Sequence, residues 1–228
     1  MPAKAPTEPA LQRAVFCDFD GTITAEDTFS VMLQAFAPAE SARLLPELYA
    51  GRIALRTGVR QALEAIPSRH YPAMVAHADS QPLRPGLSEL LDFLDARGIP
   101  LHVVSGGLRG MVERVLSRQR SGDCSLLERV ASVSALELNA SSEYLRVRSA
   151  FEGGDELVSK VQVMAQSGAR ERIAIGDSLT DLNMARAADL TFARDRLGRY
   201  LQAENVAYVP WNDFFQVRAY LAQWWEAA

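Results

Sequence analysis

Cysteine is scarce in this chain, and it contains neither long apolar runs nor clusters of basic residues. Its two cysteines, Cys17 and Cys124, do not make a disulfide framework, and neither lies in a CxxC pair. No stretch approaches the length of a membrane span. The net charge of −4, without a basic run, argues against nucleic acid as a partner. We therefore expect a soluble protein of a reducing compartment, the cytoplasm, with neither membrane nor nucleic acid among its partners.

The first nine residues, MPAKAPTEP, lack the apolar segment of a signal peptide, so we expect a loose arm there. Apolar residues make up 48% of the 228-residue chain, which allows a sizeable core. This length suits one large domain, or one domain with an insertion.

The stretch Ala14 to Thr24, AVFCDFDGTIT, organises the rest of the chain. Its apolar start predicts a short buried strand, which ends abruptly in Asp18 and Asp20. Carboxylates two positions apart in a strand point the same way, and two close anions call for a cation. Gly21 allows a sharp turn, and Thr22 adds a hydroxyl donor. The alternative is a turn that merely closes the strand, with both carboxylates solvated.

Strand and helix patterns alternate along the rest of the chain, which predicts an α/β fold with a doubly wound parallel sheet. A hairpin is expected from 136–138 and 144–147. The other expected strands are 99–104, 130–133, 172–175, 190–192 and 206–209, and the expected helices include 108–118, 156–166 and 184–188. His102 lies within the second strand, where it is expected to pack in the core.

Residues 25–83 show only helical spacing, broken by Pro38, Pro46, Gly51 and Pro67. A block of helices that follows the first strand should lie above the edge of the sheet. We therefore expect a small helical cap at 25–83, and a catalytic core formed by 1–24 and 84–228.

Polar groups also mark other strand ends and helix starts: Ser105-Gly106, Lys160, and the pair Asp177 and Asp181. Together they suit phosphoryl transfer. One carboxylate can attack phosphorus, a second can protonate the leaving oxygen, others can hold Mg²⁺, and the donors can neutralise phosphate oxygens. Each also has a plainer reading: a strand-to-helix turn, a solvated helix charge, or a helix cap.

The four motifs DFDGT, VVSGG, the lysine and GDSLTD occur in the order found in haloacid-dehalogenase-superfamily phosphatases. The chain resembles their phosphoserine-phosphatase-like subgroup over residues 14 to about 215. The resemblance implies Mg²⁺-dependent hydrolysis of a small phosphorylated metabolite through an aspartyl-phosphate, by a monomer or homodimer. The roles that it implies are Asp18 as nucleophile; Asp20 as acid and base; Asp18, the Asp20 carbonyl and Asp177 as metal ligands; Asp181 behind them; and Thr22, Ser105, Gly106 and Lys160 on the phosphate.

Two further segments, ADLTFARDRL and VAYVPWNDF, resemble the methionine-salvage branch of the subgroup. A phosphoserine phosphatase, a phosphotransferase and a non-catalytic relative that binds a phosphorylated ligand are the alternatives. Asp27 is expected among the substrate-binding residues. Arg52, Arg56 and Arg60 are candidates to face the substrate as well, or are exposed helix charges.

Overall fold

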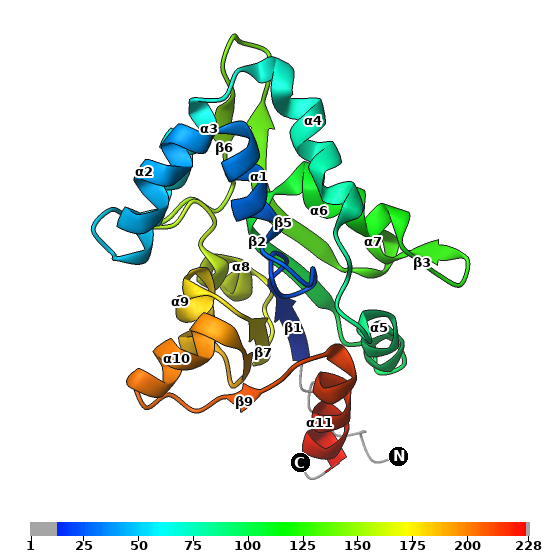
Figure 1. The fold of residues 1–228 in the computed structure, drawn as a ribbon. Helices are drawn as coiled ribbons and strands as arrows, with labels where there is room; N and C mark the ends of the chain where they lie inside the picture. The colour runs from blue at the N-terminus through cyan, green and yellow to red at the C-terminus, as the bar shows by residue number, and fades with distance from the viewer. Residues whose placement is uncertain (1–12, 227–228) are drawn as a thin grey trace, which may run out of the picture.

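A computed structural model describes residues 13–226, apart from the side chain of Tyr49. In this part of the chain seven strands form one sheet, in the order β6-β5-β2-β1-β7-β8-β9 (Figure 1). All neighbours are parallel except β5 and β6, so the predicted parallel α/β sheet is confirmed. The expected N-terminal arm lies outside the described residues. The strands are β1 (Arg13–Cys17), β2 (Leu101–Leu108), β5 (Ser132–Asn139), β6 (Arg146–Arg148), β7 (Glu171–Gly176), β8 (Leu190–Ala193) and β9 (Val209–Pro210).

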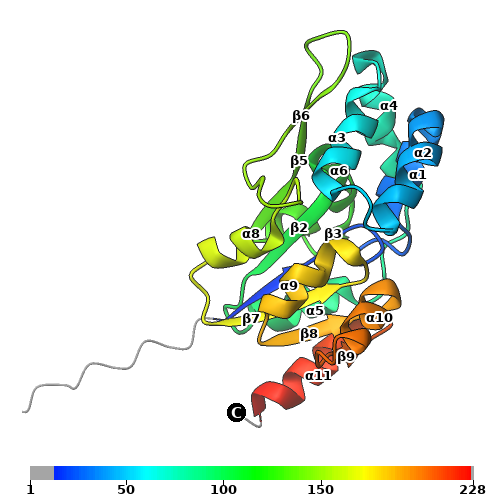
Figure 2. The same cartoon turned by 90° about the vertical axis from the view of Figure 1, so that its left-hand side faces the viewer.

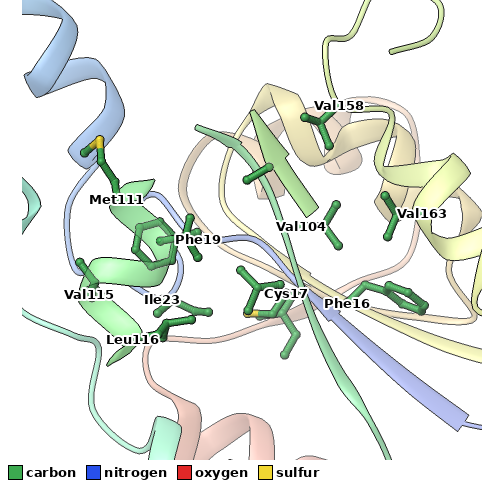
Figure 3. Close-up of a cluster of buried hydrophobic side chains, with 14 of the residues drawn as sticks. Phe16, Cys17, Phe19, Ile23, Val104, Met111, Val115, Leu116, Val158 and Val163 are labelled. Carbon is green, nitrogen blue, oxygen red and sulfur yellow. The ribbon is translucent and has the colours of Figure 1, made fainter. Parts of the chain in front are cut away.

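Strand β1 lies in the middle of the sheet, between β2 and β7, with Val15 opposite both Leu101 and Ile173. Both of its faces are covered, which is why it is continuously apolar from Ala14 to Cys17 rather than alternating. Figure 3 shows Phe16 next to Val163 on one side of the sheet. The core continues past the strand, where Phe19 and Ile23 pack beside Met111, Val115 and Leu116 (Figure 3).

Helices cover both faces of the sheet (Figures 1 and 2). Right-handed crossovers between parallel strands produce this arrangement and bring the carboxyl ends of the strands to one edge. Among residues 13–226, no helix has the length and apolar character needed to cross a bilayer. One face carries α5 (Leu87–Asp95), α6 (Arg109–Arg118), α7 (Leu126–Arg129) and α11 (Phe214–Glu226), and the other carries α8 (Lys160–Gln166), α9 (Leu182–Ala187) and α10 (Asp195–Ala203).

The segment between β1 and α5, which we call the helical insertion, is helical as predicted and lies beyond the carboxyl edge of the sheet (Figure 1). It contains α1 (Thr28–Phe36), α2 (Pro38–Tyr49), α3 (Leu55–Glu64), η1 (Ser68–His70), α4 (Tyr71–Ala76) and η2 (His77–Ser80). Pro46 does not break the segment as expected but lies inside α2. An antiparallel bridge joins Thr24 to Leu83, where the chain leaves and re-enters the core. The division into two domains at 25 and 83 stays a prediction.

The strand boundaries differ from the prediction at β2 and β5. Strand β2 was expected to end at Val104, but it continues through Ser105 and the glycines to Leu108, with a register shift against β5. The small residues let the backbone bend without leaving the sheet. The expected strand 130–133 and the first hairpin strand are one strand, β5, because α7 ends only at Arg129.

The later elements also begin or end differently. Helix α8 starts at Lys160 rather than near Glu156, because Gly153 and Glu156 pair in a short bridge before it. The last strand is limited to Val209–Pro210. A two-stranded ribbon that the sequence did not predict, β3 (Arg120–Ser121) and β4 (Cys124–Ser125), follows α6. His102 is only half-buried; it stacks on Phe16, and its Nδ1 lies 2.8 Å from the Ser132 hydroxyl.

The hairpin of β5 and β6 contacts the helical insertion far from its chain connections (Figure 1). The Ser68 amide donates to the Glu143 carbonyl at 2.9 Å, and the Leu145 amide donates to the Ile66 carbonyl at 3.0 Å. The insertion is therefore attached to the core by its two linkers and by a separate set of backbone hydrogen bonds.

Candidate active site

A buried ion-pair triad lies at the carboxyl edge of the sheet. Asp18 follows β1, and Lys160 is the first residue of α8. The Lys160 ammonium lies 2.5 Å from Oδ1 of Asp18 and 2.5 Å from Oδ1 of Asp181. All three side chains are at most 4% exposed, so Lys160 is not a solvated helix charge. Because a buried charge needs a partner, the lysine and the carboxylates hold one another in place.

Burial shapes the protonation of these groups. It raises the pKa of Asp18 to about 7, with the Asp181 charge adding to the rise and Lys160 opposing it. Burial also raises the pKa of Asp177 to about 9 and that of Asp20 well above its usual range, and the charge of Asp18 adds to both. Burial alone lowers the pKa of Lys160, but the two carboxylates raise it above its ordinary value. The site is rich in negative charge and poor in solvent, which favours a cation.

Asp177 and Asp181 share a tight turn after β7. The Thr22 hydroxyl donates to Oδ1 of Asp177 at 3.0 Å. Oδ2 of Asp181 accepts from the backbone amides of Asp177 and Ser178, at 3.0 Å each. A Cβ at Gly176 would lie 2.6 Å from Cγ of Asp181, so this position needs glycine. Asp181 thus orients the turn that presents Asp177.

Oxygen atoms from Asp18, Asp177 and Asp181 lie within 4.8 Å of one another. Three carboxylates this close are a donor set for a hard divalent cation. The family resemblance implies Asp18, the carbonyl of Asp20 and Asp177 as ligands, with Asp181 supporting them. Both oxygens of Asp181 already accept protein hydrogen bonds, which fits that supporting position.

The Asp20 carboxylate points to a different set of donors. The Ser105 hydroxyl donates to its Oδ2 at 3.1 Å, and the Phe29 amide in α1 donates to its Oδ1, also at 3.1 Å. The Gly107 amide donates in turn to the Ser105 hydroxyl at 2.8 Å. A Cβ on Gly107 would clash with the Asp20 carboxylate. The bent end of β2 therefore fixes Asp20 from one side and the helical insertion fixes it from the other.

A cavity of about 330 Å³ opens above these groups, between the sheet edge and the helical insertion. Asp18, Asp20, Asp177 and Gly106 line its polar floor. Thr22, Ser105 and Lys160 are buried behind that floor and do not line it. The opposite side, which we call the apolar roof, consists of Phe29, Leu33, Leu45, Leu48, Leu55 and Val59. Such a cavity suits a molecule with one polar and one apolar end, with a cation between the carboxylates and any anionic group.

The charged candidates in the helical insertion separate into two groups. Asp27 lines the cavity, and its carboxylate also caps α1 by accepting from the Ser30 amide at 2.9 Å. The three arginines do not line it, which favours the alternative that they are charges on helix surfaces. Arg52 pairs with Glu47 at 2.6 Å, while Arg56 and Arg60 both pair with Glu152 of the segment that follows β6.

Several cavity residues were not anticipated from the sequence. In the sequence, the residues of the apolar roof show only the spacing that is typical of ordinary helix packing. Asp195 and Arg196, at the start of α10, also line the cavity. Asp195 has a φ of 46°, which is uncommon outside glycine and was not signalled by any motif.

The chain matches the haloacid dehalogenase-like hydrolase family over residues 15–186. It belongs to this family. The matched range begins in β1 and includes the lysine and the Asp177–Asp181 turn. The prediction from the motifs, a phosphatase of the haloacid dehalogenase-like family, is confirmed.

Two similar proteins of the haloacid dehalogenase-like family carry the same name. A 2-hydroxy-3-keto-5-methylthiopentenyl-1-phosphate phosphatase from Microcystis aeruginosa strain NIES-843 is 52% identical over 211 residues, covering 92% of this chain and 98% of the relative. One from Bacillus cereus strain B4264 is 28% identical over 215 residues, covering 91% and 94%.

Solved structures share the fold. A substrate-bound phosphoserine phosphatase has a TM-score of 0.67 at 17% identity, covering 93% of this chain and 99% of that one. The phosphoserine phosphatase from T. onnurineus has a TM-score of 0.68 at 16% identity, covering 95% and 98%. These likenesses concern the fold alone, and they cover the sheet as well as the helical insertion.

Proposed function

We propose that this chain hydrolyses a small phosphorylated metabolite through an aspartyl-phosphate on Asp18. One observation carries the proposal: Asp18 and Asp20 both line the floor of one cavity, with Lys160 on the buried side of Asp18. A phosphate monoester placed on this floor meets a nucleophile and a proton donor together.

In the first step an Asp18 carboxylate oxygen attacks phosphorus and forms an acyl phosphate, while the ester P–O bond breaks. Asp20 gives its proton to the leaving oxygen, and its burial, which raises the pKa well above the usual range, favours the protonated form. In the second step Asp20 takes a proton from water as the water oxygen attacks phosphorus. Asp18 is released, and inorganic phosphate leaves.

The acidic cluster fits Mg²⁺, because its donors are carboxylate oxygens gathered within 4.8 Å. Asp18, the carbonyl of Asp20 and Asp177 would hold the ion, with Asp181 supporting Asp177. When bound, Mg²⁺ supplies positive charge to the phosphate oxygens. Thr22, Ser105, Gly106 and Lys160 complete the phosphate environment in this proposal. Ser105 orients Asp20, and Thr22 orients Asp177.

For the substrate we propose 2-hydroxy-3-keto-5-methylthiopentenyl-1-phosphate, because the name of the relative that is 52% identical contains this compound. The apolar roof supports this choice, because a methylthio-bearing carbon chain gains by burial against leucine and valine. Phosphoserine carries an ammonium and a carboxylate, which need charged partners. Among the described residues, the helical insertion brings only Asp27 to the cavity as a charged side chain, and α10 adds Asp195 and Arg196. The apolar roof, rather than a lack of charge, is therefore what favours the methylthio substrate. Residues 25–83 would thus act as the cap that selects the substrate.

The decisive experiment measures phosphate release by the purified protein from this substrate, phosphoserine and an aryl phosphate, with Mg²⁺ or EDTA. We expect the methylthio substrate to have the highest kcat/KM, and EDTA and Asp18→Asn to abolish release. Phosphate release by Asp18→Asn near the wild-type rate would overturn the nucleophile assignment. A phosphorylated acceptor in place of free phosphate would identify a transferase, and tight ligand binding without turnover a non-catalytic relative.

Leu55 tests the apolar roof directly. It lines the cavity from the start of α3 and is only half-buried, so Leu55→Asn changes the cavity wall with little effect on the core. We expect KM for the methylthio substrate to rise about 3- to 10-fold, since a few lost apolar contacts are worth this much. The kinetics of a short-chain alkyl phosphate should stay unchanged. An equal effect on both substrates would contradict the proposed contact.

A further inference from the structure

Arg84 lies where the chain returns from the helical insertion to the core. Its amide donates to the Ile23 carbonyl at 2.9 Å, and the Ala25 amide donates to the Pro82 carbonyl at 2.9 Å. The outgoing and returning linkers therefore run side by side at this point. The Arg84 side chain is directed into the molecule and is only 8% exposed.

The guanidinium of Arg84 binds backbone carbonyls instead of a carboxylate. Its Nε donates to the Thr22 carbonyl at 2.9 Å, and its Nη2 donates to the Gly21 carbonyl at 2.7 Å. Within residues 13–226 it forms no ion pair. Its remaining contacts are the carbonyls of Thr24, Ala25 and Asn212, at 3.3–3.5 Å, and the ring of Trp211, 5.4 Å from Cζ.

A buried cation without a carboxylate partner needs a reason, because desolvating the charge is unfavourable. Here the planar fork of the guanidinium satisfies several carbonyls of one turn at once. A lysine ammonium has fewer donors, all on one nitrogen, and could not reach these separate carbonyls together. The gain is a turn, residues 21–25, that is held in one conformation.

The same turn determines where Asp177 lies. The Thr22 hydroxyl donates to Asp177, and Gly21 approaches it so closely that a Cβ there would lie 2.6 Å from Oδ2 of Asp177. Asp20 immediately precedes the turn, and Asp18 is two residues further back. Displacement of the turn would therefore move Asp177 relative to the nucleophile.

We propose that Arg84 is a positioning residue for the reaction: it fixes the turn 21–25, and through it the spacing of Asp18 and Asp177. It also joins both linkers of the helical insertion to the segment Trp211–Asn212, so that the insertion and the metal-binding carboxylates share one anchor. The inference rests on the proposed function, since it assigns Arg84 a part in that reaction.

The test compares Arg84→Lys and Arg84→Met with the same substitutions at Arg129. The Arg129 side chain is also largely buried, at 12% exposed, and it binds Asp92, Asp95 and Ser121 away from the cavity. For Arg84→Lys we expect kcat to fall about 10-fold or more and the Mg²⁺ concentration for half-maximal activity to rise several-fold. Arg129→Lys should lose stability while keeping both values within about twofold of wild type.

A second readout needs no turnover. The rise in Tm on adding Mg²⁺ should be smaller in Arg84→Lys than in Arg129→Lys, because a displaced Asp177 binds the ion less well. Added guanidinium, at concentrations that do not unfold the protein, should restore part of kcat in Arg84→Ala. It should not restore kcat in Asp18→Asn.

The outcomes separate the two proposals. An active wild-type enzyme whose Arg84→Lys variant keeps wild-type kcat and Mg²⁺ requirement overturns the role of Arg84 and leaves the proposed function standing. A wild-type protein that binds Mg²⁺ without hydrolysing any phosphate ester overturns the proposed function, while the comparison of Tm values still decides whether Arg84 positions the metal site. A wild-type protein with neither property overturns both.

Discussion

The ammonium of Lys160 lies 2.5 Å from Oδ1 of Asp18, and both side chains are at most 4% exposed. Removal of the ammonium leaves two buried carboxylates, Asp18 and Asp181, without their counter-charge. Breaking a buried pair from one side typically destabilises a protein by about 3–5 kcal/mol. We expect Lys160→Met to lower the free energy of unfolding by about that amount, measured by urea denaturation in EDTA.

The matched control for Lys160→Met is the double variant Lys160→Met/Asp181→Asn. It removes one of the two stranded charges, so it should recover part of the lost stability. A loss below about 1 kcal/mol in the single variant would contradict the buried triad.

The raised pKa values of Asp18, about 7, and Asp177, about 9, make stability depend on pH in the metal-free protein. Each folded-state pKa lies above the unfolded value. The stabilisation from binding these protons is therefore full below about pH 4 and is lost as the pH rises through 7 and then 9. We expect Tm in EDTA to fall between pH 6 and pH 9.

Added Mg²⁺ should raise Tm more at the upper end of this pH range, because the cation no longer competes with protons. Scanning calorimetry with and without Mg²⁺ measures both effects. Asp177→Asn provides the control, because the fall in Tm toward pH 9 should flatten in this variant. A metal-free Tm that rises over the same interval would contradict the assignment.

Gly107 has no room for a side chain, because a Cβ would clash with the Asp20 carboxylate. At Gly106 the nearest atom to a built Cβ is Cγ2 of Thr180, at 3.9 Å. We expect Gly107→Ala to reduce kcat about 10- to 100-fold by displacing the proton donor, and Gly106→Ala to reduce it less. Steady-state kinetics decide between them. Equal losses would mean that the displacement of Asp20 is not the cause.

Glu64 connects α3 to the hairpin: Oε1 accepts from the Val147 amide at 3.1 Å, and the carboxylate pairs with Arg60 and Arg146 at 3.4 Å. Glu64→Ala leaves the amide without this partner, so we expect a loss of about 1–2 kcal/mol in the free energy of unfolding. The surface pair of Arg52 and Glu47 is the comparison. Arg52→Ala should leave stability unchanged, and equal losses in both variants would exclude a special role for the hairpin contact.

The convergence of Asp18, Asp20 and Asp177 could be predicted from the sequence, because each follows an apolar strand and parallel strands end at one edge. The hydrogen bond from Thr22 to Asp177 could not be predicted, since 155 positions separate the two residues and a hydroxyl has many possible acceptors. The same limit applies to Arg60, whose partner Glu152 is 92 positions away. Arg84 gave no signal, because its partners are carbonyls, which every residue carries.

The second attachment of the helical insertion, through the hairpin, has a consequence for chimeric enzymes. An exchange of residues 25–83 with those of a relative would discard the groups that face Glu143, Leu145 and Val147. The Val147 amide would lose the Glu64 carboxylate, and the two backbone hydrogen bonds would form only where the relative's chain follows the same path. A transplant intended to change substrate preference therefore has to carry the segment from β5 to Glu152 along with the helices.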